Sequence, residues 1–220
     1  HYIPDRNSCR HYYCHARWTF FCLAIKTTKK VERELIMKKS AKSDPKKRKG
    51  LIIVNTGEGK GKSTASFGLA LRAAGNKMNV FIMQFMKGPW KAGERKALKA
   101  LSEYIEYEAM GDGFTWDTEN PEQDKKTARN AFDIAKEKLM SEKYQMVILD
   151  EINYVLEYKF FPLEEFLETL KNKPKEVHVV CTGRNANKKL IEIADLVTEM
   201  KLIKHPYDEQ GIPAQKGIEF

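Results

Sequence analysis

The feature that most constrains the fold is the glycine- and lysine-rich stretch TGEGKGKST at residues 56–64. It follows an apolar run, LIIVN at 51–55, and precedes ASFGLALRAAG at 65–75, whose apolar residues have helical spacing. A glycine-rich turn between a buried strand and a helix directs backbone N–H groups and the positive end of the helix dipole toward one point. Such a point suits a polyphosphate. The sequence therefore predicts a phosphate-binding loop, and the order of strand, loop and helix disfavours a flexible loop without chemistry.

The loop is a variant of the P-loop pattern G-x-x-x-x-G-K-[ST]. Gly61, Lys62 and Ser63 satisfy the end of the pattern, whereas Thr56 stands where the first glycine is expected. In this pattern the lysine reaches the β- and γ-phosphates and the hydroxyl binds Mg²⁺. We therefore expect Lys62 to be catalytic and Ser63 to be a metal ligand. The loop residues expected to bind the nucleotide are Gly57, Glu58, Gly59, Lys60, Gly61, Lys62, Ser63 and Thr64.

A second motif, MVILDE at residues 146–151, is an apolar run that ends in two carboxylates. In P-loop proteins an acidic residue at such a strand end holds Mg²⁺ directly or through water. Asp150 and Glu151 are therefore candidate metal ligands. Alternatively the two acids begin a helix, with Asp150 as the cap and Glu151 in the first turn. The neighbouring P-loop favours the metal site.

The rest of the chain after Gly50 alternates short β-branched runs with helical patterns, which is typical of βαβ units. This order predicts an α/β, P-loop NTPase-like, three-layer fold with a mostly parallel central sheet. The expected strands are 51–55, 79–84, 105–109, 145–149, 177–182 and 196–202. The clearest expected helices are 62–74, 122–141, 162–172 and 187–194, with Pro121 and Pro162 near two of their N-termini.

The positive charge of the chain is concentrated at its N-terminus. The net charge is +9, yet residues 1–50 hold 14 Lys and Arg against 4 Asp and Glu, whereas residues 51–220 hold 25 against 26. A folded part near neutrality argues against nucleic-acid binding as its function. We expect a basic tail at 1–49, disordered or non-native before a native start at Met37, and one domain at 50–220.

Cysteine usage favours a reducing compartment such as the cytoplasm, because residues 51–220 contain a single cysteine, Cys181. No apolar run reaches the length of about 18 residues that a membrane span needs. An amphipathic membrane anchor in the tail is disfavoured, because its apolar residues do not form a stripe along one face of a helix. A small zinc site in the tail is disfavoured, because no second pair of zinc-site spacing follows its cysteines and histidines. These tail residues are Cys9, His11, Cys14 and His15.

Taken together, the ordered motifs of residues 50–220 resemble the cobalamin-type corrinoid adenosyltransferases. The motifs are GEGKGKS, QF-x-KG-x-W-x-x-GER at 84–95, GFTW-x-T at 113–118, LDE, TGR at 182–184, and KH…AQKGIEF at 204–220. Glu58 departs from the Asn or Asp more usual in that family, and Ser63 stands where Thr is common. Residues 1–49 do not match the pattern.

The resemblance implies transfer of the 5′-deoxyadenosyl group of ATP to the Co(I) centre of a reduced corrinoid, with release of triphosphate and with Mg²⁺ as cofactor. It implies that Phe114 and Trp116 are catalytic, packing where the lower axial ligand of the corrinoid would lie. Arg72 and Arg184 are weaker candidates for nucleotide or corrinoid contacts, as are residues 93–95. A homodimer and an electron-donating reductase or flavoprotein also follow from the resemblance.

Two other classes of function are compatible with the motifs. A P-loop ATPase or small-molecule kinase would use Glu151 to activate water or a substrate hydroxyl, and its products would be phosphate or a phosphorylated substrate. A nucleic-acid-binding module would use the basic tail as an arm, and its binding would weaken with salt.

Overall fold

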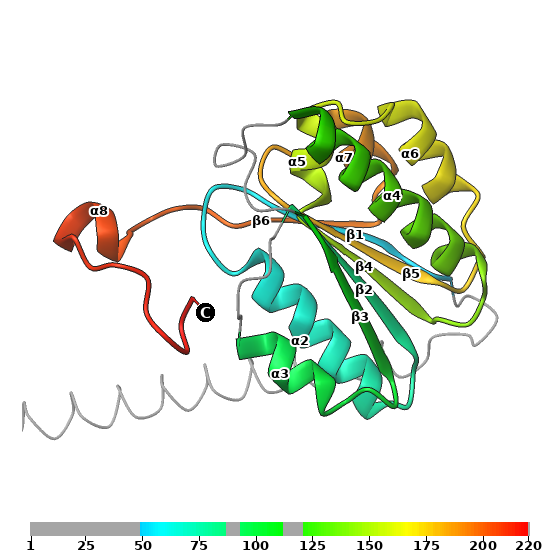
Figure 1. Ribbon diagram of the computed structural model, residues 1–220, viewed down its shortest axis with the longest axis horizontal. Helices are drawn as coiled ribbons and strands as arrows, with labels where there is room; N and C mark the ends of the chain where they lie inside the picture. Colours follow the sequence, from blue (N-terminus) through cyan, green and yellow to red (C-terminus); the bar gives the residue numbers. More distant parts are fainter. Residues whose placement is uncertain (1–48, 87–92, 112–120, 220) are drawn as a thin grey trace, which may run out of the picture. The chain divides into compact units, whose positions relative to one another are not determined.

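The computed structural model describes residues 49–86, 93–111 and 121–219, which form a six-stranded sheet with helices on both faces (Figure 1). Residues 1–48 of the basic tail, Met37 among them, lie outside the described residues. The strands are β1 (Ile52–Thr56), β2 (Val80–Phe85), β3 (Ile105–Met110), β4 (Met146–Asp150), β5 (His178–Thr182) and β6 (Leu196–Glu199). The helices are α2 (Lys62–Gly75), α3 (Gly93–Lys99), α4 (Pro121–Met140), α5 (Ile152–Glu157), α6 (Leu163–Lys171), α7 (Lys188–Ile193) and α8 (Pro206–Gln210).

The strand order is β3-β2-β4-β5-β1-β6, and every neighbouring pair is parallel. The expected P-loop NTPase-like α/β fold is confirmed, with a sheet that is parallel throughout its described strands. In a parallel sheet all carboxyl ends lie along one edge, where ligands bind in open α/β folds. Because β5 lies between β1 and β4, the segment after β5 separates the P-loop from the acidic end of β4.

The sheet separates two apolar cores, as strand alternation requires. On β2, Phe81, Met83 and Phe85 face one core and Val80 and Ile82 face the other. Figure 1 shows α4, α5, α6 and α7 on one face of the sheet and α2 and α3 on the opposite face. Burial on both faces explains why the central strands are continuous apolar runs.

The last strand is shorter than expected. The prediction of a strand over 196–202 is wrong beyond Glu199, which pairs with Thr56 at the end of β1. β1 ends at Thr56 and the chain continues as the P-loop, so no further residue of β1 is available to pair with β6. The chain instead crosses the loop, and the Met200 carbonyl accepts a hydrogen bond from Gly59 N at 2.6 Å.

Three short helices are additional to the clearest ones expected from the sequence. They are α3, α5 and α8, of 7, 6 and 5 residues. Helices of two turns or fewer present too few apolar positions to show a helical period. In the part of the chain that the structure describes, no helix has the length and apolar character needed to cross a membrane.

A histidine ties β5 to β1 at the amino edge of the sheet. His178 Nδ1 accepts a hydrogen bond from Leu51 N at 3.1 Å, so this ring nitrogen carries no proton in the fold. Burial lowers the pKa of His178 below its ordinary value of 6.5, and the nearby Lys173 charge lowers it further. The unfolded chain therefore binds a proton at this residue at a higher pH than the folded chain does. The contribution of His178 to the free energy of unfolding is complete above its pKa in the unfolded chain, and it is lost as pH falls through its lower pKa in the folded chain.

We predict that the free energy of unfolding, measured in urea, decreases as pH is lowered from about 7 to about 5, and that His178→Asn flattens this slope. The Asn carbonyl oxygen still accepts from Leu51 N but does not titrate. His205→Asn, a change at an N-cap on α8, should keep the wild-type slope. Equal slopes in wild type and His178→Asn would contradict the assignment.

Candidate active site

The P-loop joins β1 to α2 and closes around its own lysine. Lys62, the first residue of α2, donates from Nζ to the carbonyls of Gly57 and Gly59, both at 2.7 Å. Burial lowers the Lys62 pKa, and the negative charges of Glu151 and Glu58 oppose that effect. The ammonium therefore lies at the centre of the loop, where a bound polyphosphate would take the place of the two carbonyls.

The loop glycines are required by close backbone packing. Gly57 and Gly61 have φ of +96° and +105°, a region that favours glycine. A Cβ on Gly57 would lie 2.5 Å from the Met200 carbonyl oxygen, and one on Gly59 would lie 2.7 Å from that of Lys201. The segment leaving β6 thus rests directly on the loop and leaves no room for side chains there.

The threonine that replaces the first P-loop glycine has a defined role. Thr56 is buried, and its hydroxyl accepts a hydrogen bond from Ala186 N at 3.1 Å. Ala186 lies just after the TGR motif, so Thr56 fastens the segment after β5 to the start of the P-loop. This contact explains the departure from the usual pattern.

The remaining loop residues surround the lysine. Ser63 is half-buried and Thr64 is exposed, both in the first turn of α2. Exposed Lys60 forms an ion pair with Glu219, so the C-terminal segment reaches the loop. Glu58 forms a 3.1 Å ion pair with Arg184 of the TGR motif.

The two predicted acids at the end of β4 differ in environment. Asp150 is fully buried; its Oδ1 accepts from the Thr182 hydroxyl and its Oδ2 from the Gln84 amide, each at 2.7 Å. Glu151 is half-buried, adopts φ +66°, and is the N-cap of α5 without a side-chain capping bond. The alternative in which Asp150 caps a helix is therefore wrong.

Charges from three strand ends gather beside Lys62. The Glu151 charge acts on Lys62, and so do those of Arg184 and Glu58. The pKa of Tyr154 in α5 is raised to about 12, mainly by burial and then by the same Glu151 charge. The structure therefore brings the P-loop, the end of β4 and the TGR motif into one cluster of alternating charge, which suits a polyanion held with a cation.

The structure places one predicted site residue away from this cluster. Arg72 is exposed in the last turn of α2, ten residues beyond Lys62 and so about 15 Å along the helix axis. Phe114 and Trp116 lie outside the described residues. The structure places α4 directly after their segment, since α4 begins at Pro121.

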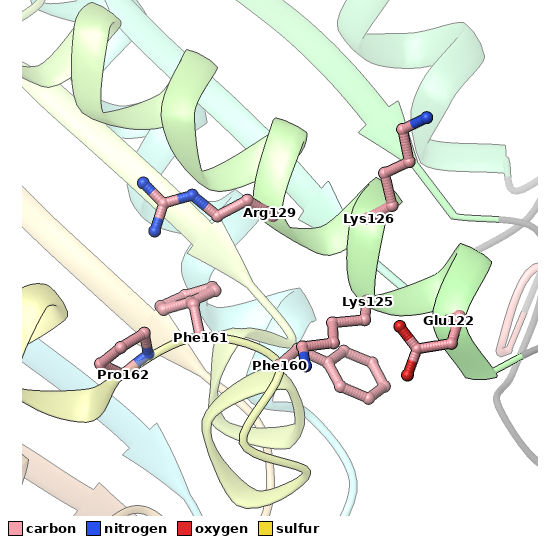
Figure 2. A pocket seen from close by; sticks show the side chains of 7 residues that line it. All are labelled: Glu122, Lys125, Lys126, Arg129, Phe160, Phe161 and Pro162. Atoms are coloured by element: carbon pink, nitrogen blue, oxygen red, sulfur yellow. The ribbon is translucent and has the colours of Figure 1, made fainter.

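A pocket of about 330 Å³ lies at the start of α4 (Figure 2). The first turns of α4 contribute charged side chains, and the connection between α5 and α6 contributes aromatic and proline side chains. The lining residues are Glu122, Lys125, Lys126, Arg129, Phe160, Phe161 and Pro162.

No role was predicted from the sequence for Gln84, Tyr107 or Thr182, although Gln84 begins the QF motif, Thr182 begins the TGR motif, and all three join the polar contacts at the carboxyl edge. A signal was present for two of them. Gln84 and Thr182 are polar residues near the ends of the otherwise apolar runs VFIMQF and HVVCT. A fully buried polar side chain needs a partner.

Comparison with known proteins gives one consistent result. Residues 48–220 match the model of the family described as ATP:corrinoid adenosyltransferase BtuR/CobO/CobP. The chain is 48% identical to a corrinoid adenosyltransferase of Sinorhizobium sp. over 194 residues, covering 87% of this chain and 88% of that protein. It is 42% identical to that of Escherichia coli (strain K12) over 172 residues, covering 78% and 86% respectively. It is 39% identical to that of Pseudomonas aeruginosa over 193 residues, covering 86% and 95%.

We predict that Lys62→Ala raises the dissociation constant for ATP about 10- to 100-fold, since a hydrogen bond to a charged group contributes about 1.5–3 kcal/mol. Isothermal titration calorimetry measures this directly. Lys171→Ala removes an exposed lysine in the last turn of α6, and it should leave the affinity unchanged. Unchanged ATP affinity in a folded Lys62→Ala variant would exclude the P-loop assignment.

Proposed function

This chain belongs to the ATP:corrinoid adenosyltransferase family, and we propose that its reaction takes place at the charge cluster around Lys62. The activity of the family is transfer of the adenosyl group of ATP to a corrinoid in cobalamin biosynthesis. The observation that carries the placement is that three strand ends meet there. Glu58 of the P-loop pairs with Arg184 at 3.1 Å, and Thr182 of the same TGR motif donates to Asp150 at the end of β4. The alternative activity, that of an ATPase or a small-molecule kinase with the same loop, is not favoured.

In the proposed reaction the Co(I) centre of the reduced corrinoid is the nucleophile. Its electron pair forms a cobalt–carbon bond to C5′ of the ribose, the C5′–O bond breaks, and those electrons leave with inorganic triphosphate. The protein must neutralise this leaving group and orient C5′ toward the cobalt. Lys62 and the loop N–H groups would perform the first task, together with Ser63 and Thr64 in the first turn of α2.

The oxygen groups of the site suit Mg²⁺, which prefers hard oxygen donors and usually keeps several waters and substrate phosphates. Ser63 and Glu151 would hold the ion. The Asp150 oxygens already accept two hydrogen bonds in a fully buried position. Asp150 would therefore support Glu151 instead of binding the ion directly. Bound Mg²⁺ would add positive charge against the developing triphosphate. Within the described residues no cluster of three or more His, Cys, Asp or Glu competes for a metal.

The corrinoid would bind beside the segment that contains Phe114 and Trp116. These rings would occupy the position of the lower axial ligand and favour a four-coordinate cobalt that is easier to reduce. The basic and aromatic pocket at the start of α4 follows this segment directly in the chain. An electron-donating reductase or flavoprotein would supply the Co(I) state.

We also propose that the protein is a homodimer. Edge strand β6 is exposed at all four residues, and Leu196 and Val197 lie on it. Beyond it Leu202, Ile203 and Tyr207 are exposed as well, with Ile203 84% accessible. Exposed apolar residues on an edge strand support packing of a second copy. Sedimentation equilibrium distinguishes this dimer from a monomer.

We propose that residues 1–49 form a tail that precedes a catalytic domain at 50–220 in the chain, and that the protein works in the cytoplasm. The family match begins at residue 48, and Cys181 is a buried free thiol. The Sinorhizobium relative, however, matches over 87% of this chain, which is more than residues 50–220 span. Activity of chains beginning at Met37 and at Lys49 would show which part of the tail the domain needs.

We predict that incubation of the protein with ATP, Mg²⁺ and a chemically reduced Co(I) corrinoid yields adenosylated corrinoid and triphosphate in equal amounts. The corrinoid is followed by its absorption spectrum and the phosphates by anion-exchange chromatography. Lys62→Ala is the control and should abolish most turnover. Release of orthophosphate in place of triphosphate would support the ATPase class instead.

We predict that Phe114→Ala and Trp116→Ala slow adenosylation chiefly when the assay starts from a Co(II) corrinoid and a protein reductant. ATP binding should be spared, because it depends on the P-loop. A corrinoid already reduced to Co(I) should be affected less, since it needs no help in losing an axial ligand. Equal impairment from both starting states, or weaker ATP binding, would make this segment a general positioning element.

A further inference from the structure

A continuous chain of hydrogen bonds crosses the carboxyl edge of the sheet toward Asp150. Arg95, in the first turn of α3, donates from Nε to the Tyr107 hydroxyl on β3 at 2.8 Å. The Tyr107 hydroxyl donates to Gln84 Oε1 on β2 at 2.5 Å. Gln84 then donates from Nε2 to Asp150 Oδ2 at 2.7 Å. Side chains from α3, β3 and β2 thus lead to one carboxylate on β4.

A second branch reaches the same carboxylate from the other side. Thr182, at the end of β5, donates its hydroxyl proton to Asp150 Oδ1 at 2.7 Å. The same Thr182 oxygen accepts a hydrogen bond from the backbone N–H of Glu151 at 2.8 Å. The threonine therefore fastens both the Asp150 side chain and the Glu151 backbone.

The donor and acceptor chemistry makes the direction of the first branch unambiguous. The Arg95 guanidinium is only a donor, so the Tyr107 oxygen accepts from it and offers its own proton to Gln84. Gln84 must then turn its carbonyl to Tyr107 and its amide nitrogen to Asp150. Burial is the main cause that raises the pKa of Tyr107, which keeps the hydroxyl proton in place. Every bond in the branch donates toward Asp150.

Burying these polar side chains costs desolvation free energy that a purely structural contact would not require. Gln84 is 1% accessible, and Asp150 and Thr182 are fully buried. Apolar residues of similar volume would fill the same strand ends without the desolvation cost of buried polar groups, which is often neutral or better for stability. A fully hydrogen-bonded buried network does, however, hold a carboxylate in one orientation. A fixed orientation of Asp150 is useful here because the next residue, Glu151, contributes its charge to the cluster around Lys62.

We propose that Tyr107, Gln84 and Thr182 are positioning residues that hold the Asp150 carboxylate and the Glu151 backbone in the geometry that binds the metal–triphosphate group. This inference rests on the proposed function for the metal site, and it adds residues that touch neither ATP nor metal. Tyr107 is two hydrogen bonds away from Asp150. An effect at Tyr107 on metal binding is therefore the sharpest test of the chain.

The experiment uses the full chain with ATP and Mn²⁺, a paramagnetic substitute for Mg²⁺ whose free concentration is read by electron paramagnetic resonance. Tyr107→Phe keeps the ring and removes only the hydroxyl. We expect it to weaken Mn²⁺ binding to the ATP complex and to lower kcat, each by about 10-fold, because residues that orient metal ligands typically change affinity or activity 10- to 100-fold. The KM for ATP should change little, since the P-loop is untouched.

Tyr104→Phe is the matched control. It removes a hydroxyl that is hydrogen-bonded to Glu103, just before the amino end of β3 and three residues from Tyr107, and it should leave both readouts at the wild-type value. A second pair tests the other branch. Thr182→Val removes the hydroxyl from a side chain of nearly the same shape, whereas Thr182→Ser keeps it. We expect loss of Mn²⁺ affinity in the Val variant and recovery in the Ser variant.

Wild-type values of Mn²⁺ affinity and kcat in a folded Tyr107→Phe variant would overturn the proposal. Should that variant fail to fold, equal Mn²⁺ affinities in Thr182→Val and Thr182→Ser would overturn it as well. Failure of the proposed function is a separate outcome, because it would appear as absent adenosyl transfer in the wild type. The Mn²⁺ measurements need no turnover and decide the positioning role in that case too.

Discussion

A fully buried carboxylate is the constraint on which the site depends. Asp150 ends the central strand β4 and has no access to water, so its charge must be compensated by donors within the fold. The two neighbouring strands supply them, Gln84 from β2 and Thr182 from β5. The identity of polar residues on three strands is thereby linked, and the backbone of Glu151 is held as a consequence.

A second constraint acts on the P-loop from the other side of the site. The backbone after β6 packs on Gly57 and Gly59 so closely that a Cβ on either would clash. The Gly59 N–H is itself used in this packing, because it donates to the Met200 carbonyl at 2.6 Å. Packing of the C-terminal segment therefore selects glycine at both positions, and the hydrogen bonds of Met200 with Thr56 and Gly59 tie the loop to β6.

The adjacency of β1, β5 and β4 explains how one cluster serves a charged leaving group. The P-loop follows β1, the TGR motif follows β5, and the acids end β4. Thr56 contacts the segment after β5, and Thr182 of β5 contacts Asp150. The middle strand thus connects the phosphate loop to the acidic strand end, and a cation and a triphosphate would share this edge with Lys62 and Arg184.

The sequence by itself determined the P-loop, the carboxylates after β4, the parallel α/β class and the family. Each is recorded locally, because apolar runs report buried strands and fixed spacings report loop chemistry. It also named Lys62, Asp150 and Glu151 as candidate site residues. Only the tertiary structure decided that Gln84 and Thr182 meet Asp150, that Met200 covers the P-loop, and that Arg72 lies away from it. These contacts join residues far apart in the chain, and they depend on strand order and on where a strand stops, which no local pattern encodes.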